Sequence, residues 1–164
     1  SLPNDPLAKS IKEKKAVYNS LGTQKGEATN FIAVGSSAHG VLNDQYYFQN
    51  FYEQDLYRKS LKEGKLPIYR GLKMKPDDVI RREVIRHIRT FFNIEFDFFD
   101  KKYPYKFKDY FQKELINLKT MENDGLLKIN ENNIMLTPLG EHFSPQIANV
   151  FDVYNDQEFY KRAI

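Results

Sequence analysis

The strongest constraint on the fold of this chain is an amphipathic segment that begins at Pro76. Proline suits the first position of a helix, and the acidic side chains of Asp77 and Asp78 suit the first turn. Apolar residues then recur at helical spacing, at Ile80, Val84, Ile88 and Phe91. The segment therefore predicts a long helix whose apolar face must be covered by other elements.

Aromatic, helical and hairpin patterns follow this helix in turn. Ten of the 21 residues from 91 to 111 are Phe or Tyr, which we interpret as core where helices meet. Residues 107–123 repeat apolar side chains at helical spacing. Residues 126–129 and 134–136 flank an Asn-rich turn, and this pattern predicts a hairpin.

A last helix is predicted from Thr137 and Pro138 onward. Pro145 must kink or split it, because proline lacks the backbone N–H that a helix interior needs, before it continues over residues 147–154. The predicted order of elements is therefore helix, helix, two-stranded hairpin and helix. This is the order found in a winged-helix domain.

The N-terminal part of the chain is less regular. Residues 5–15 predict a short helix capped by Asp5, and residues 18–30 lack periodicity and predict a loop. Residues 31–34 are all apolar and run into a small-residue turn, which predicts a buried strand. So short a strand needs a sheet, and no clear partner precedes it.

A further helix is predicted from a cap at Asn50 to a stop at Gly64, with residues 66–71 as a connector. Its inner side is expected to hold Tyr52, Leu56 and Leu61. A boundary near residues 66–75 separates a strand-and-loop part from a helical part. The predicted fold class is mainly α with a small β component, an α+β fold.

The composition excludes several kinds of functional site in this chain. The chain has no cysteine, which excludes a thiolate nucleophile and any cysteine-held zinc or iron–sulfur cluster within these 164 residues. No apolar run approaches the roughly 18 residues that cross a bilayer, and the N-terminus lacks a signal-peptide pattern, so we expect a cytoplasmic protein without membrane partners. The net charge of +3 permits nucleic-acid binding but does not require it.

Four arginines of the amphipathic helix are candidate ligand-binding residues. Arg82, Arg86 and Arg89 share one helix face, with Arg81 beside them, and could bind phosphates or carboxylates bidentately. The alternative is a solvated face paired with neighbouring carboxylates. His39 sits in the small-residue turn, where a backbone can approach a ligand, whereas His87 and His142 have no second ligand at a metal-binding spacing.

Several motifs occur in order along almost the whole chain. They are GSSA at 35–38, DQYYFQN at 44–50, EGKLPIYRG at 63–71, DDVIRREVI at 77–85, FKDYF at 107–111, DGL at 124–126, LTPLG at 136–140, FDVY at 151–154 and the ending FYKRAI. In these motifs the chain closely resembles the C-terminal part of the oxygen-independent coproporphyrinogen III oxidases, a family of radical S-adenosylmethionine (SAM) enzymes.

The resemblance implies a role in heme biosynthesis. The family oxidatively decarboxylates coproporphyrinogen III to protoporphyrinogen IX, using SAM and a [4Fe–4S] cluster held by cysteines near the N-terminus. Residues 1–50 would then be the end of the barrel-like radical SAM domain, and residues 51–164 the helical, winged-helix-like C-terminal domain. No cofactor is expected in this chain, which would be inactive without its N-terminal radical SAM domain.

The resemblance also assigns residues to the site. Tyr18 and Asn19 stand where the family has an active-site Phe and Gln, and His39 stands where it has an Ile that contacts SAM. We therefore expect these three residues on the SAM side. Because the substrate carries four propionates, we expect it to be bound by Arg81, Arg82, Arg86 and Arg89.

The sequence leaves two alternatives open. The Ala38-His39 pair resembles the related heme-chaperone and heme-utilisation branch, whose strand ends in Gly-Ala-His-Ser, and His39 could then be a heme ligand. The other alternative is a free-standing winged-helix module that binds nucleic acid. Its third helix over 107–123 has nearly balanced charges, which does not favour groove binding.

Overall fold

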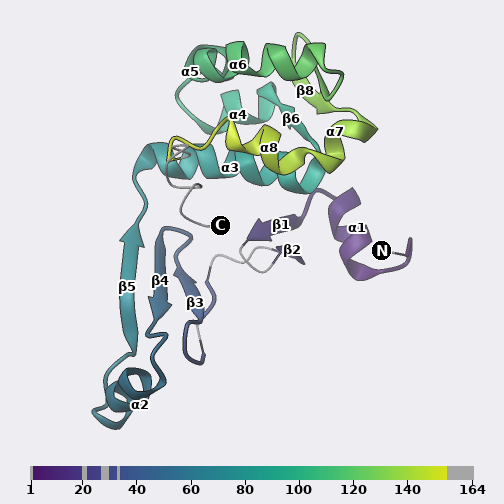
Figure 1. Cartoon of the computed structure of the whole chain (residues 1–164). Coiled ribbons are helices and arrows are strands. Elements are labelled where there is room, and N and C mark those ends of the chain that lie inside the picture. The colour runs from purple at the N-terminus through teal and green to yellow at the C-terminus, as the bar shows by residue number, and fades with distance from the viewer. Residues whose placement is uncertain (1, 20–21, 27–29, 33, 155–164) are drawn as a thin grey trace. The chain divides into compact units, whose positions relative to one another are not determined.

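The computed structural model describes residues 2–19, 22–26, 30–32 and 34–154 (Figure 1). The chain divides into two units, the first made of residues 1–25 with 80–164 and the second of residues 26–79. Helices and strands both contribute to the fold, as the sequence predicts.

The amphipathic helix is confirmed as α3, Pro76–Phe91. Its buried face in the first unit holds Ile80, Val84 and Ile88, which join one hydrophobic core with the elements that follow. Strand β6, Asn93–Glu95, comes directly after it. The helix gives way to the strand at Phe92, whose φ of +58° no longer fits a helix.

The aromatic region forms the centre of this core, as its composition predicts. Helices α4, Phe96–Lys102, and α5, Phe107–Tyr110, bring the rings of Phe96 and Phe107 to a stacked distance of 4.5 Å. The single helix expected over 107–123 is instead divided into α5 and α6, Gln112–Asn123. The break falls at Phe111, which is fully buried with a backbone at φ −104°, ψ 29°.

A small antiparallel sheet closes the core, with strand order β6-β8-β7. The predicted hairpin is confirmed as β7, Leu127–Ile129, and β8, Asn133–Leu136. The third strand, β6, was not predicted because it is only three residues long and lies among aromatic residues.

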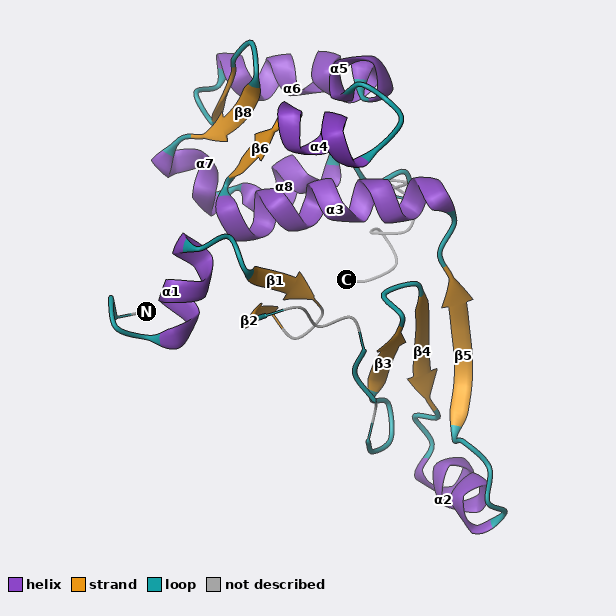
Figure 2. Ribbon diagram, turned by 180° about the vertical axis from the view of Figure 1, so that it is seen from behind, coloured by secondary structure: helices purple, strands orange, loops and turns teal. Residues whose placement is uncertain are grey.

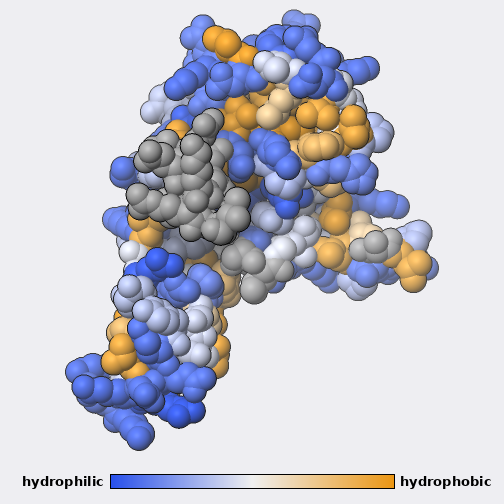
Figure 3. Space-filling model, viewed as in Figure 1, coloured by the Kyte–Doolittle hydropathy of each residue, from blue (hydrophilic) through white to orange (hydrophobic). Residues whose placement is uncertain are grey.

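Two short helices end the described part of this unit. Pro145 does divide the predicted last helix, into α7, Pro138–His142, and α8, Ser144–Asn149. The helix ends at Asn149, so its predicted continuation to residue 154 is wrong. Figure 3 shows apolar side chains gathered on the surface near these helices, where Leu139 and Phe143 are exposed.

The N-terminal segment of the first unit contains a helix and a hairpin. Helix α1, Pro6–Lys12, is confirmed, with the Asp5 carboxylate accepting a 2.7 Å hydrogen bond from the Leu7 N–H. Strands β1, Ala16–Asn19, and β2, Gly22–Lys25, pair where a loop was predicted. Strands this short have too few residues to show a period, and Gly22, at φ +98°, supplies a backbone turn that other residues rarely adopt.

The second unit is an antiparallel sheet with order β3-β4-β5 and one helix (Figure 2). Its strands are β3, His39–Leu42, β4, Tyr46–Asn50, and β5, Ile68–Lys73. The connector predicted at 66–71 is therefore wrong, since most of it lies in β5. Every residue of β5 is exposed, so this strand lacks the apolar alternation that marks a half-buried one.

Two other predictions in this unit are also wrong. The segment 31–34 is no buried strand: Phe31 makes a single bridge with Val41, while Ile32 and Val34 are 78% and 85% exposed, and Ala33 lies outside the described residues. Helix α2, Gln54–Lys62, begins after Glu53 rather than Asn50, and it buries none of its residues. The Asn50 side chain belongs to the sheet, where its amide donates to the Gly35 carbonyl at 3.0 Å.

Candidate functional site

Arg81 is held inside the first unit by a charged partner. Its guanidinium lies 2.7 Å from the Glu114 carboxylate, and the two side chains are only 15% and 9% exposed. It also donates to the Phe151 carbonyl at 3.3 Å and lies over the Phe111 ring at 5.5 Å. Arg81 therefore ties α3 to α6 and to the segment after α8.

The partner of Arg81 was missed from the sequence, although a signal was present. Glu114 follows Phe111 by three residues and precedes Leu118 by four, so it lies within the apolar stripe of the predicted helix. A carboxylate in a buried stripe requires a cation or several hydrogen bonds. Which cation it finds depends on the tertiary structure.

Arg89 brings two of the predicted site residues together. Its guanidinium lies 4.9 Å from the centre of the Tyr18 ring and donates to the Tyr18 hydroxyl at 3.2 Å. A second N–H of the same group donates to the Ser144 hydroxyl at 3.0 Å. Arg89 thus joins strand β1, helix α3 and helix α8 at one point, and Ser144 had no sequence signal that marked it.

Arg82 and Arg86 lie one helical turn apart on α3, and both are half-buried. Each has interactions within the chain. The neighbouring acid Glu83 contacts Lys102 at 2.5 Å and the Tyr103 hydroxyl. Two guanidinium groups at this spacing can bind two oxyanions, or one larger anion, from the same side of the helix.

The remaining predicted SAM-side residues lie in different units. In the first unit, the Asn19 amide donates to the Gln24 side chain at 3.2 Å across the β1-β2 hairpin. In the second unit, His39 begins β3, pairs with Gln49 and is exposed.

The other two histidines, His87 and His142, lie in different environments. His87 packs against Phe98 and Phe91, with ring centres 4.8 Å and 5.2 Å away. Burial in this stack lowers the pKa of His87 below its ordinary value of 6.5. His142 is exposed in the last turn of α7.

The described ranges lack both a cluster of metal ligands and a membrane-spanning helix. They contain no group of three His, Cys, Asp or Glu side chains that could hold a metal ion. No helix among them is long and apolar enough to cross a membrane.

Comparison with known proteins finds a family model that matches the middle of this chain. Residues 74–141 match the family model described as HemN C-terminal domain. They contain α3 with its arginines, the aromatic core and the β7-β8 hairpin.

Similar proteins extend the match beyond this domain. The chain is 33% identical over 136 residues, 83% of its length, to an oxygen-independent coproporphyrinogen III oxidase of Helicobacter pylori, and covers 30% of that protein. It is 31% identical to the Synechocystis protein of that name over an alignment of 170 positions, which covers 99% of this chain and 36% of that protein. The chain spans about a third of the length of these relatives.

A solved structure shows the same likeness. The chain superposes with a TM-score of 0.87 and 30% identity on the coproporphyrinogen III oxidase (HemN) from Escherichia coli, described as a radical SAM enzyme. The match covers 93% of this chain and 35% of that one. The chain therefore corresponds to the C-terminal portion of the oxygen-independent coproporphyrinogen III oxidases, which confirms the resemblance seen in its motifs.

Proposed function

We propose that the protein containing this chain is a radical SAM enzyme that oxidatively decarboxylates coproporphyrinogen III to protoporphyrinogen IX. The observation that carries this proposal is the match in sequence and fold to such oxidases over nearly the whole chain. In the complete protein, SAM and a [4Fe–4S] cluster would supply the radical that removes hydrogen from a propionate. This chain has no cysteine to bind the cluster, and in the proposed enzyme the N-terminal radical SAM domain would bind it.

The part proposed for this chain is to bind and position the substrate. Arg82 and Arg86 are partly accessible, cationic and one turn apart, which suits the carboxylates of a tetra-anionic substrate. Arg81 and Arg89 would act mainly by positioning α3, because their guanidinium groups already bind Glu114, Tyr18 and Ser144.

The assignment of SAM-side positions remains a proposal. Tyr18, Asn19 and His39 would face SAM by their place in the family motifs. The contact between Tyr18 and Arg89 is compatible with a continuous SAM and substrate surface, because it joins one proposed SAM-side residue to the arginine helix.

The domain roles are proposed in the same way. Residues 1–50 would complete the barrel-like radical SAM domain, and residues 51–164 would form a winged-helix-like cover. The exposed apolar side chains of the second unit, which include Leu42, Leu56 and Leu72, would then contact the N-terminal domain.

Charge reversal in the full-length enzyme tests the substrate role. The double variant Arg82→Glu/Arg86→Glu is expected to raise the KM for coproporphyrinogen III by at least about tenfold, because each lost charge-assisted pair is worth about 1.5–3 kcal/mol. The matched control is Lys113→Glu/Lys128→Glu, which alters the net charge by the same amount at two exposed positions. An unchanged KM, or an equal rise in the control, would contradict the assignment.

A further inference from the structure

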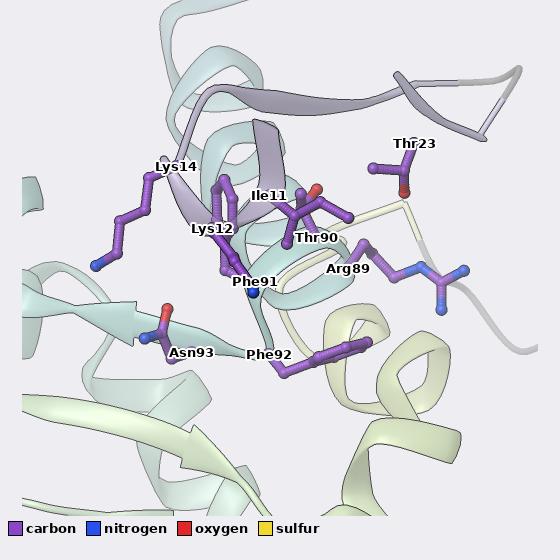
Figure 4. A pocket seen from close by; sticks show the side chains of 9 residues that line it. All are labelled: Ile11, Lys12, Lys14, Thr23, Arg89, Thr90, Phe91, Phe92 and Asn93. Atoms are coloured by element: carbon purple, nitrogen blue, oxygen red, sulfur yellow. The ribbon is translucent and has the colours of Figure 1, made fainter. Parts of the chain in front are cut away.

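A basic pocket lies in the first unit where the end of α1 meets the end of α3 (Figure 4). Its volume is about 310 Å³, at the lower end of the range for small-molecule sites. Residues of α1 and β2 form one wall, and residues 89–93 form the other.

The pocket has a positive lining. It includes Lys12 and Lys14 and no acidic residue. Among the described residues neither lysine takes part in an ion pair, and the intervening Glu13 pairs instead with Lys15 at 2.8 Å. Figure 4 shows the Lys14 side chain extending toward Asn93 at one end of the pocket. Uncompensated positive charge in a concave site attracts anions.

Thr90, whose hydroxyl is buried, also lines the pocket. Thr90 is only 4% exposed, and its Oγ1 has no hydrogen-bond partner in the described part of the chain. A buried hydroxyl without a partner is unfavourable, because it has lost its hydrogen bonds to water. An oxygen of a bound ligand would supply the missing acceptor.

The backbone around the pocket is strained at two lining positions. Lys14 and Phe92 have φ values of +54° and +58°, in the left-handed region that side-chain-bearing residues seldom adopt. Such conformations collect at binding sites, where the surrounding structure holds them. Both of these residues line the pocket.

We propose that this pocket binds a small molecule through an oxyanion group, a phosphate or a carboxylate. Lys12 and Lys14 bind the charge, the Thr90 hydroxyl donates to a ligand oxygen, and the apolar part of the ligand packs on Ile11 and Phe91. Because binding here needs neither the cluster nor oxidase activity, the inference goes beyond the proposed function and is tested separately from it.

Calorimetric titration of the 164-residue chain tests the proposal, with pyrophosphate and citrate as phosphate and carboxylate probes. AMP and adenosine form a further pair that differs only in the phosphate. We expect binding of at least one anionic probe in the millimolar range or tighter, and none of adenosine. Binding of pyrophosphate and AMP alone identifies a phosphate site, and binding of citrate alone identifies a carboxylate site.

Variants locate the site. Lys12→Gln/Lys14→Gln is expected to weaken binding by about tenfold or more, since each lysine loses a charge-assisted contact. The control Lys9→Gln/Lys59→Gln removes the same charge at exposed positions outside the pocket and should change affinity less than about twofold. Thr90→Val should weaken binding several-fold without lowering the urea midpoint, because it removes a hydroxyl that has no partner.

Three results would overturn the proposal. They are no binding of any anionic probe, equal weakening in the control, and unchanged affinity in Lys12→Gln/Lys14→Gln. If the lysines only compensate the carbonyl ends of α1 and α3, the first of these results is expected, together with a lower urea midpoint of that variant.

Discussion

Gly140 offers the sharpest test of how this domain is held together. A Cβ placed on Gly140 would lie 1.7 Å from the Leu126 carbonyl oxygen and 2.7 Å from its carbon. Both atoms belong to the backbone and cannot rotate away. The close approach joins the DGL and LTPLG motifs, so it gives a physical reason for the glycine in the second of them.

The neighbouring hydrogen bonds prevent an inexpensive adjustment. The Leu126 carbonyl accepts from the Thr137 N–H at 3.0 Å and from the Thr137 hydroxyl at 3.2 Å. The same hydroxyl accepts from the Gly140 N–H at 3.1 Å and so caps α7. Moving Leu126 or α7 to relieve the clash would weaken these bonds and shift the buried Leu127.

Gly140→Ala is therefore expected to destabilise the domain strongly. Overpacking costs about 1–3 kcal/mol, and two weakened hydrogen bonds add about 1 kcal/mol each, which gives a loss of about 3–5 kcal/mol. Helix propensity alone predicts the opposite change in the free energy of unfolding, because Ala is favoured over Gly in a helix by about 1 kcal/mol.

Urea unfolding followed by circular dichroism measures the difference. The control is Gly64→Ala, at a glycine with φ +69° and open space around its Cβ position, where we expect only backbone strain of about 1–2 kcal/mol. A Gly140→Ala variant as stable as the original chain, or more stable, would refute the argument from the Leu126 contact.

Three further predictions concern a buried ion pair and two histidines. Arg81→Met should lower the free energy of unfolding by about 3 kcal/mol, because Glu114 is left buried without its cation, and Arg81→Met/Glu114→Leu should recover most of the loss. A double variant no better than the single one in urea unfolding would contradict this. Burial lowers the pKa of His87 below 6.5, so the unfolded chain binds a proton that the folded chain resists. The stability due to neutral His87 should be complete above pH 6.5 and lost as the pH falls through the lowered folded pKa, and His87→Phe should remove this loss from a series of urea midpoints. Hemin titration should give the same Soret change with and without His39→Ala if the oxidase assignment is right, whereas a change that requires His39 would favour the heme-binding alternative.

Local signals made several elements predictable from the sequence. Helix-start and turn residues act on their near neighbours in the chain, so the sequence marks these elements directly. Examples are Asp5 with Pro6, Asp77 with Pro76, and the Asn-rich turn at 130–133. The motifs likewise indicated the resemblance to the oxygen-independent coproporphyrinogen III oxidases, which the similar proteins confirm.

The partners of the site residues were not predictable in this way. Tyr18 and Arg89 are 71 positions apart, and Arg81 meets Glu114 across 33 positions, so no local rule connects either pair. The strands of the second unit were missed for a related reason. Strand β5 has no buried residue, so the sequence shows no periodic pattern and the strand exists only because β4 pairs with it.

By itself, the sequence determined the resemblance to the coproporphyrinogen III oxidases, the amphipathic helix with its four arginines and the aromatic core. Only the tertiary structure decided which distant groups Arg81 and Arg89 bind, namely Glu114 for the first and Tyr18 and Ser144 for the second. The physical reason is that helical periodicity and capping are short-range properties of the chain. Which groups satisfy a buried charge depends on where distant segments meet.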